Sequence, residues 1–169
     1  MKRSACWVNL NPRKQATVAE VSFEDKDTIV YLRSVIEPYA ARLSVEKIPQ
    51  QRIDEVRMTL QKVMADPYDT QSYVTSDLAL HELLHQYAGS RILSEVISSV
   101  KEHSIRLRYS AERFGSDDIE EQASITKIST QEHLEILDAI EKRDGELAYQ
   151  RVHDHIYNFA HRLDYLPHE

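Results

Sequence analysis

The chain has 169 residues, 29% of them charged, with only three glycines and five prolines. That length suits a single domain, and so few glycines and prolines indicate long helices joined by few turns. The formal net charge of −7 argues against strong nucleic-acid binding by this chain, and the single cysteine, Cys6, excludes a disulfide framework. Because no apolar stretch is long enough to span a membrane or form a signal peptide, we expect a cytoplasmic protein with no membrane partner.

Residues 1–24 differ from the remainder of the chain. Apolar and polar residues alternate on both sides of residues 11–14, which is typical of two strands joined by a turn. A hairpin of this size is not stable alone. We therefore expect residues 1–24 to form a short β-hairpin-like segment attached to a larger domain.

The period of the apolar residues then becomes that of a helix. A first helix is expected from residue 23 or 25 to 45, with Pro38 inside it, where a kink or a lost hydrogen bond is expected. A second helix is expected over 50–65, and a third over 69–87, ending near Gly89. The expected inward residues of the first helix are Ile29, Leu32, Ile36, Ala40 and Leu43.

Three more helices complete the expected fold. The fourth covers residues 90–113, followed by a turn at 114–117. The fifth covers residues 124–143, or begins as early as 118, and the sixth covers 145–163. The fold class is therefore all-α, a six-helix antiparallel bundle preceded by a short β-hairpin-like segment.

Four residues indicate a metal site. Asp77 and His81 are four residues apart, so they share one face of the third helix. His133 lies 11 residues before Asp144 and His155 lies 11 after it, so an antiparallel hairpin that turns there brings both imidazoles to the same height. All four sit within apolar stripes, where a divalent ion would satisfy a carboxylate and three imidazoles. The alternative is that these are core histidines satisfied by hydrogen bonds alone.

Two further histidines lie close to these positions in the sequence. His85 continues the face of Asp77 and His81, and we interpret it as a polar residue at the helix edge, with ligation in another register as the alternative. His153 is two residues from His155 and is expected to point elsewhere.

Several segments of the sequence together resemble a known domain. They are YLRSVIEPYAARL at 31–43, DLALHELL at 77–84, and EHLEILDAIEKRDGELA at 132–148 followed by HDHI at 153–156. With the 22-residue gap from His133 to His155, they resemble the opening helix, the D-x-x-x-H helix and the final hairpin of the FCD domain. That is the effector-binding domain of GntR-family transcriptional regulators of the FadR subfamily. The resemblance covers about residues 23–164.

The resemblance implies a cofactor and a ligand. In that family an aspartate and three histidines, here Asp77, His81, His133 and His155, hold a divalent ion in the bundle centre. Zinc is the first candidate, with nickel or manganese as alternatives. An open position on a buried ion suits a small carboxylate effector, and Arg33, on the inward stripe of the first helix, is the candidate clamp for it. The alternative is that Arg33 pairs with Glu37 at the surface.

The resemblance also gives residues 1–24 a meaning. They are similar to the wing of a winged helix-turn-helix plus a linker, whereas residues 25–165 correspond to the effector-binding and dimerisation domain. The helices that would enter the DNA major groove have no counterpart in the sequence. We therefore expect a homodimer that reaches operator DNA only through a winged-helix domain largely missing here.

Two classes of function remain. One is a ligand-sensing domain of a transcriptional regulator, which needs no turnover. The other is a helical-bundle metalloenzyme acting on a small hydroxy or sugar acid. The paired Glu-x-x-His motifs of di-iron bundles are absent from the sequence, and no general base is evident beside the four candidate ligands. We therefore predict the sensor and not an enzyme.

Overall fold

A computed structural model describes residues 3–5, 8–10, 17–18, 23–114 and 118–164 of the chain. The described residues contain six helices, as predicted. Their bounds are α1 Phe23–Ser44, α2 Gln50–Ala65, α3 Thr70–Gln86, α4 Arg91–Phe114, α5 Ile119–Glu141 and α6 Gly145–Asp164.

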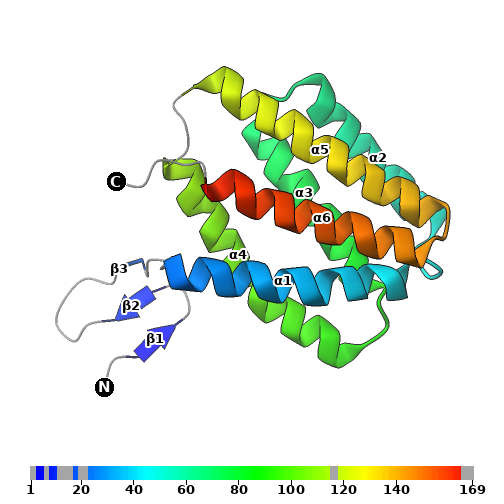
Figure 1. Cartoon of the computed structure of the whole chain (residues 1–169), viewed down its shortest axis with the longest axis horizontal. Helices are drawn as coiled ribbons and strands as arrows, with labels where there is room; N and C mark the ends of the chain where they lie inside the picture. Colours follow the sequence, from blue (N-terminus) through cyan, green and yellow to red (C-terminus); the bar gives the residue numbers. More distant parts are fainter. Residues whose placement is uncertain (1–2, 6–7, 11–16, 19–22, 115–117, 165–169) are drawn as a thin grey trace.

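The helices form a bundle in which helices that follow one another in the chain run in opposite directions (Figure 1). Figure 1 shows α1, α6, α5 and α2 following one another across the view, with α3 behind them. Helix α3 contacts α1, α2, α4 and α5, so it occupies the middle of the bundle. The all-α, six-helix prediction is confirmed. No helix among the described residues combines the length and the apolar character needed to cross a bilayer.

Three short strands precede the bundle: β1 Arg3–Ala5, β2 Val8–Leu10 and β3 Thr17–Val18. They form an antiparallel sheet in the order β1-β2-β3, with Ala5 opposite Val8 and Asn9 opposite Thr17. The predicted strand pair corresponds to β2 and β3, whereas β1 was not predicted. The predicted turn at residues 11–14 lies outside the described residues, and so does the predicted turn at 114–117 except for its first residue.

Residues favoured at helix ends bound the helices. Pro49 directly precedes α2. Asp69 caps α3 by accepting a 3.0 Å hydrogen bond from the backbone N of Ser72, and Asp118 caps α5 by accepting a 2.9 Å bond from the backbone N of Glu120. These side chains satisfy amides that have no partner within the helix. Helix α5 therefore begins at the earlier of its two predicted starts.

The turn between α5 and α6 is tied to the end of α1. Arg143 has a left-handed φ of 57°, and its guanidinium donates to the carbonyl oxygens of Val45 and Ile48. Gly145, the first residue of α6, lies so close to α1 that a Cβ there would be 3.2 Å from the carbonyl oxygen of Arg42. A glycine at this position lets the two helices approach each other.

The inward face of α1 is the predicted one except at Leu32. The helix continues through Pro38 without a break. Leu32, predicted to be inward, is 38% exposed, whereas Arg33 and Glu37 are buried. The other predicted inward residues are buried or pack against the core, so only Leu32 was misplaced, and the buried face also includes a charged pair.

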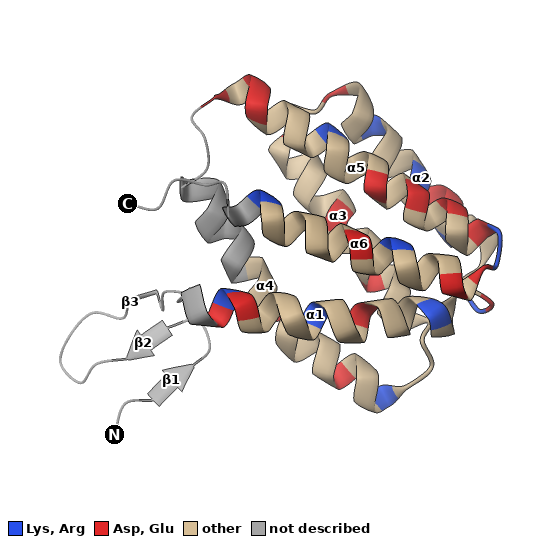
Figure 2. Ribbon diagram, viewed as in Figure 1, with Lys and Arg blue, Asp and Glu red and all other residues tan. Residues whose placement is uncertain are grey.

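An apolar core surrounds that centre. Its buried members come from α1, α2, α3, α5 and α6 and from the segment between α1 and α2, and each fully buried Leu or Ile contributes about 1.5–3 kcal/mol to folding. They are Ala41, Val45, Ile48, Ile53, Val56, Leu60, Leu80, Leu83, Leu84, Ile136, Leu137, Ala139, Ile140, Ala148, Val152 and Ile156. Charged residues of both signs are interspersed on the outer faces of α2, α5 and α6 (Figure 2). The core thus holds the polar centre in a rigid apolar frame.

Candidate metal centre and ligand cavity

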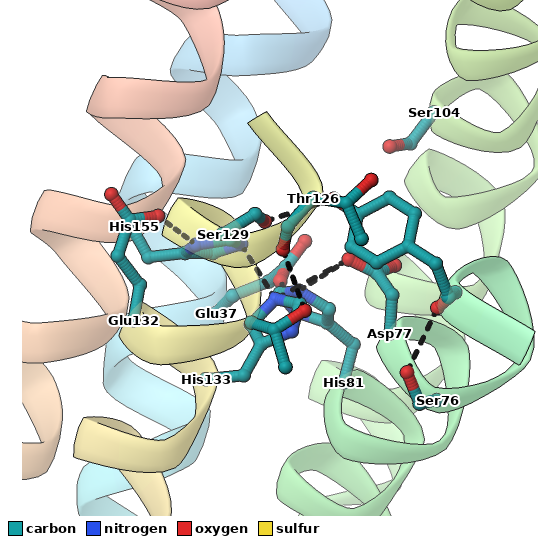
Figure 3. A network of polar contacts seen from close by, with 12 residues as sticks. Glu37, Ser76, Asp77, His81, Ser104, Thr126, Ser129, Glu132, His133 and His155 are labelled. Carbon is teal, nitrogen blue, oxygen red and sulfur yellow. Dashed lines mark hydrogen bonds and ion pairs between the residues drawn. The ribbon is translucent and has the colours of Figure 1, made fainter. Parts of the chain in front are cut away.

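Three helices bring the four predicted metal-site residues together. Asp77 and His81 come from α3, His133 from α5 and His155 from α6. Their side chains point toward one another in Figure 3. All four are buried, and one nitrogen or carboxylate oxygen from each lies within 4.8 Å of the others. Residues far apart in the sequence therefore form one compact set of nitrogen and oxygen atoms that could hold a metal ion.

The distances within this set are close to those between donors around a divalent ion, or slightly longer. Nε2 of His133 lies 3.1 Å from Nε2 of His155 and 3.4 Å from Oδ1 of Asp77. Nε2 of His81 lies 3.8 Å from the same Asp77 oxygen. An ion bound about 2.0–2.2 Å from each donor keeps neighbouring donors about 3.0–3.5 Å apart. The donor types, nitrogen and carboxylate oxygen, suit zinc, nickel and manganese.

Glu37, which the sequence did not single out as a site residue, orients His81. Nδ1 of His81 lies 2.6 Å from Oε2 of Glu37, and Nε of Arg33 donates to Oε1 of the same carboxylate at 2.6 Å. Burial alone would raise the pKa of Glu37, but the charge of Arg33 and the hydrogen bonds from Arg33 and His81 lower it well below its usual range. A carboxylate at Nδ1 favours a proton on that nitrogen and leaves the Nε2 lone pair for the donor set.

Glu132 has the same relationship to His155. Nδ1 of His155 lies 2.8 Å from Oε2 of Glu132, and Arg162 donates to both oxygens of this carboxylate, at 3.0 and 2.8 Å. Asn158 donates to Oε1 at 2.9 Å. Burial would raise the pKa of Glu132, but the hydrogen bonds from His155 and Arg162 lower it to about 2. The carboxylate is therefore ionised and held between α5 and α6.

His155 itself is neutral at ordinary pH. Burial lowers its pKa, the neighbouring His133 lowers it further, and the hydrogen bond to Glu132 opposes these effects only in part. The resulting pKa is about 3. A histidine binds a metal as neutral imidazole, so His155 is in the protonation state that ligation requires.

A cavity adjoins Asp77 and His81 between α1, α3 and α4. Its volume is about 30 Å³ for the centres of water-sized molecules, enough for about two waters. Its lining residues are Arg33, Glu37, Asp77, Leu78, His81, His85, Ile97, Lys101, Ser104 and Ile105. The donor set therefore opens on one side into a small space lined by both polar and apolar side chains.

Arg33 lines this cavity. Its side chain is 6% exposed, and Nη1 donates to Oγ of Ser104 on α4 at 3.0 Å. Arg33 also pairs with Glu37, as one alternative predicted, but the pair is buried and not at the surface. The guanidinium therefore pairs with Glu37 inside the bundle and also faces the cavity, whereas its role as a carboxylate clamp stays a prediction.

The neighbouring histidines have different positions. His85, interpreted from the sequence as a helix-edge residue, is only 5% exposed and lines the cavity. The edge interpretation was wrong because α4 covers this face of α3. His153 lies outside the donor set, half-exposed, and stacks on Tyr157 with 6.5 Å between ring centroids.

Three other site residues were missed from the sequence. Glu37 lies four residues after Arg33 on the same helix face, and the sequence predicted this pair only at the surface, not beside His81. Glu132 directly precedes His133, but its partner is His155 on another helix. Lys101 has no signal in the sequence that distinguishes it from a surface lysine.

Comparisons with known proteins agree on one family. The sequence pattern of the FCD domain matches residues 28–158. The chain is 21% identical over 155 residues to the HTH-type transcriptional repressor RspR of Escherichia coli K12. It is 25% identical over 132 residues to the galactonate operon transcriptional repressor of the same strain. These alignments cover 90% and 78% of this chain, but 64% and 55% of the relatives. The chain thus spans less than two thirds of the length of either relative.

Solved structures show the same fold. E. coli McbR/YncC has a TM-score of 0.75 at 19% identity, over 93% of this chain and 72% of that one. The metal-free FCD domain of TM0439 has a TM-score of 0.67 at 16% identity, over 87% of this chain and 95% of that one. At these identities the likeness extends to the fold alone.

Proposed function

The chain belongs to the FCD domain family, and we propose that it is the metal-containing, ligand-sensing domain of a GntR-family transcriptional regulator. The observation that carries the proposal is the buried set of Asp77, His81, His133 and His155, which opens into a cavity lined by Arg33. RspR and the galactonate repressor are both named as transcriptional repressors. The comparisons contain nothing that favours the metalloenzyme alternative.

We propose that the four residues hold one divalent ion, with zinc as the first candidate and nickel or manganese as alternatives. When bound, the ion would supply a Lewis-acidic position for a carboxylate oxygen. The spacing of the donors supports this proposal, and so do the carboxylates of Glu37 and Glu132, which orient two of the three imidazoles. The alternative is that His133 and His155 share a hydrogen bond across their 3.1 Å separation without an ion.

The proposed effector is a small carboxylate that lies between the ion and Arg33. The guanidinium is held by Glu37 and Ser104, so its direction is fixed before a ligand arrives. One relative is named for the galactonate operon, and galactonate is a carboxylate. The cavity volume of about 30 Å³ is smaller than such an acid, so the side chains that line the cavity move outward when the effector binds.

We propose that the domain forms a homodimer through α1 and α4. These two helices pack on each other and carry large apolar side chains that are at least two-fifths exposed. They are Tyr31, Val35 and Tyr39 on α1 and Ile92 and Val96 on α4. Exposed apolar residues gathered on neighbouring elements are typical of subunit interfaces.

The alignment with RspR covers 64% of that relative. We propose that DNA binding belongs to the part of such regulators outside this alignment. Residues 1–24 are proposed to be a wing and linker, and residues 25–165 the effector-binding and dimerisation domain. The antiparallel pairing of β1, β2 and β3 and the start of the family match at residue 28 support this division. The regulator is proposed to work in the cytoplasm.

A ligand screen tests the proposed function. Thermal unfolding of the zinc-loaded protein would be measured with small hydroxy acids, amines and neutral sugars, because a ligand that binds only the folded state raises the melting temperature. Acids should stabilise wild type but not the Arg33→Met variant, and each acid should be recovered unchanged. Stabilisation by amines or neutral sugars alone would contradict the effector class, and consumption of the acid would favour the enzyme.

A further inference from the structure

The cavity continues along α3, away from the candidate metal centre. Asp77, His81 and His85 follow one another at intervals of four residues, so they share a face of α3 and are spaced by about 6 Å along its axis. Asp77 and His81 belong to the donor set, whereas His85 lines the same cavity one turn further on. The proposed metal ion and the proposed contact of a carboxylate with Arg33 involve no residue at the His85 end of the cavity.

His85 presents an unsatisfied nitrogen there. The residue is 5% exposed, and its Nε2 has no hydrogen-bond partner in the part of the chain that the structure describes. Oε2 of Glu82 lies 3.5 Å away without forming a hydrogen bond. Burial lowers the pKa of His85 and Glu82 only partly opposes this, so the ring is neutral and offers one donor and one acceptor. A buried polar atom without a partner is uncommon, and it indicates a ligand or water that supplies the contact.

Lys101 on α4 faces the same end of the cavity. It is 30% exposed on its side chain and forms an ion pair with Glu82. One turn further along α4, Ser104 accepts the hydrogen bond from Arg33, so one face of α4 connects the far end with the clamp. The cavity therefore has two polar ends, with Arg33 at one and His85 and Lys101 at the other.

The net charge at the His85–Lys101 end of the cavity determines which functional group of an effector can bind there. Lys101 and Glu82 neutralise each other, and His85 is neutral. A second carboxylate placed here would face the Glu82 carboxylate and be repelled by it. A hydroxyl group can hydrogen-bond to the free His85 nitrogen and accept from the Lys101 ammonium without adding a charge.

We propose that His85 and Lys101 form a second polar subsite, one helical turn from the candidate metal centre, which receives a hydroxyl group of the effector. This inference rests on the proposed carboxylate-sensing function and narrows it. The effector is a polyhydroxy carboxylic acid, held by its carboxylate at one end and by a distal hydroxyl at the other. A matched acid without that hydroxyl leaves Nε2 of His85 unsatisfied and binds more weakly.

Calorimetric titration of the full chain, loaded with zinc, tests the subsite. Two matched pairs of acids serve as probes: 2,3,4-trihydroxybutanoate with 2,3-dihydroxybutanoate, and gluconate with 6-deoxygluconate. In at least one pair the polyhydroxy acid should bind about tenfold more tightly. In His85→Phe the ratio of the two affinities within that pair should fall to about one. The affinity for the acid without the distal hydroxyl should stay the same. Lys101→Met should also reduce the ratio, whereas Lys127→Met, on the exposed face of α5, should leave it unchanged.

The outcomes separate the two proposals. Equal affinities within both pairs, or a preference that persists in His85→Phe, would overturn the subsite while leaving the carboxylate-sensing function intact. If none of the four acids binds, the proposed function fails and the subsite fails with it. If His85→Phe does not fold, the wild-type ratio and Lys101→Met decide, because Lys101 is part-exposed and its replacement leaves no buried cavity.

Discussion

Oε2 of Glu132 accepts a 2.8 Å hydrogen bond from Nδ1 of His155, across the interface of α5 and α6. The carboxylate is itself fixed by two hydrogen bonds from Arg162. An imidazole held in this way keeps one tautomer and one ring orientation, which are the two properties that a metal ligand needs. The orientation of His155 therefore depends on a residue that is not one of the four candidate donors.

Glu132→Gln should weaken metal binding without unfolding the protein. The amide can keep the shape of the carboxylate but not its charge, so His155 becomes less basic and less well oriented. We expect the zinc affinity to fall by about 10–100-fold, measured by competition with a chromophoric chelator. Glu135→Gln is the matched control, since Glu135 also forms an α5–α6 ion pair, with Arg151, but is remote from the donor set. Equal losses in both variants would rule out a positioning role for Glu132.

Arg33→Met should destabilise the metal-free protein strongly. Its loss leaves the Glu37 carboxylate buried without its cation, which costs about 3–5 kcal/mol. The double variant Arg33→Met/Glu37→Met removes the stranded charge and should recover part of that loss. Urea denaturation measures both. Arg52→Met provides a control, because Arg52 and Glu55 form an exposed pair worth about 0–1 kcal/mol. A double variant no more stable than Arg33→Met would contradict the burial argument.

Acid should destabilise the metal-free protein below pH 6.5. In the unfolded chain His155 takes up a proton near its ordinary pKa of 6.5, whereas in the folded protein its pKa is about 3. The unfolded state therefore binds more protons between these values, and stability falls as the pH falls through that window. Glu132, lowered from 4.5 to about 2, adds a loss of the same sign below pH 4.5.

The expected loss from His155 between pH 7 and pH 5 is about 2 kcal/mol. Urea denaturation at the two pH values measures it in the chelator-treated protein. His155→Gln should show a smaller loss over this interval, whereas His153→Gln, outside the donor set, should behave as wild type. If His155→Gln loses as much stability as wild type, His155 is not the buried neutral group that its surroundings imply.

The helices were largely predictable from the sequence because their periodicity and end signals are local. Helix α2 has the predicted bounds, set by Pro49 and by the Asp66-Pro67 pair. The approach of His133 and His155 was predictable because the two lie at equal distances from one turn. These signals need only the geometry of a helix and of a hairpin.

The features that the sequence did not predict depend on how the helices are rotated against one another. Leu32 was assigned to the core because it is apolar, yet it is exposed. Arg33 faces inward as predicted, but its partners there, Glu37 and Ser104, were not predicted as a buried set. His85 was assigned to the helix edge because the position of α4 was not known. Contacts between residues 71 positions apart, such as Arg33 with Ser104, have no local signature.

Metal content tests the central claim most directly. Elemental analysis of the purified protein, after incubation with zinc or nickel and removal of the excess, should give close to one ion per chain. His133→Ala and His155→Ala should lose most of it, whereas His153→Ala should retain it. The metal-loaded wild type should also melt at a higher temperature than the metal-free protein, because the ion binds only the folded state. A folded wild-type protein that remains metal-free under these conditions would contradict the account.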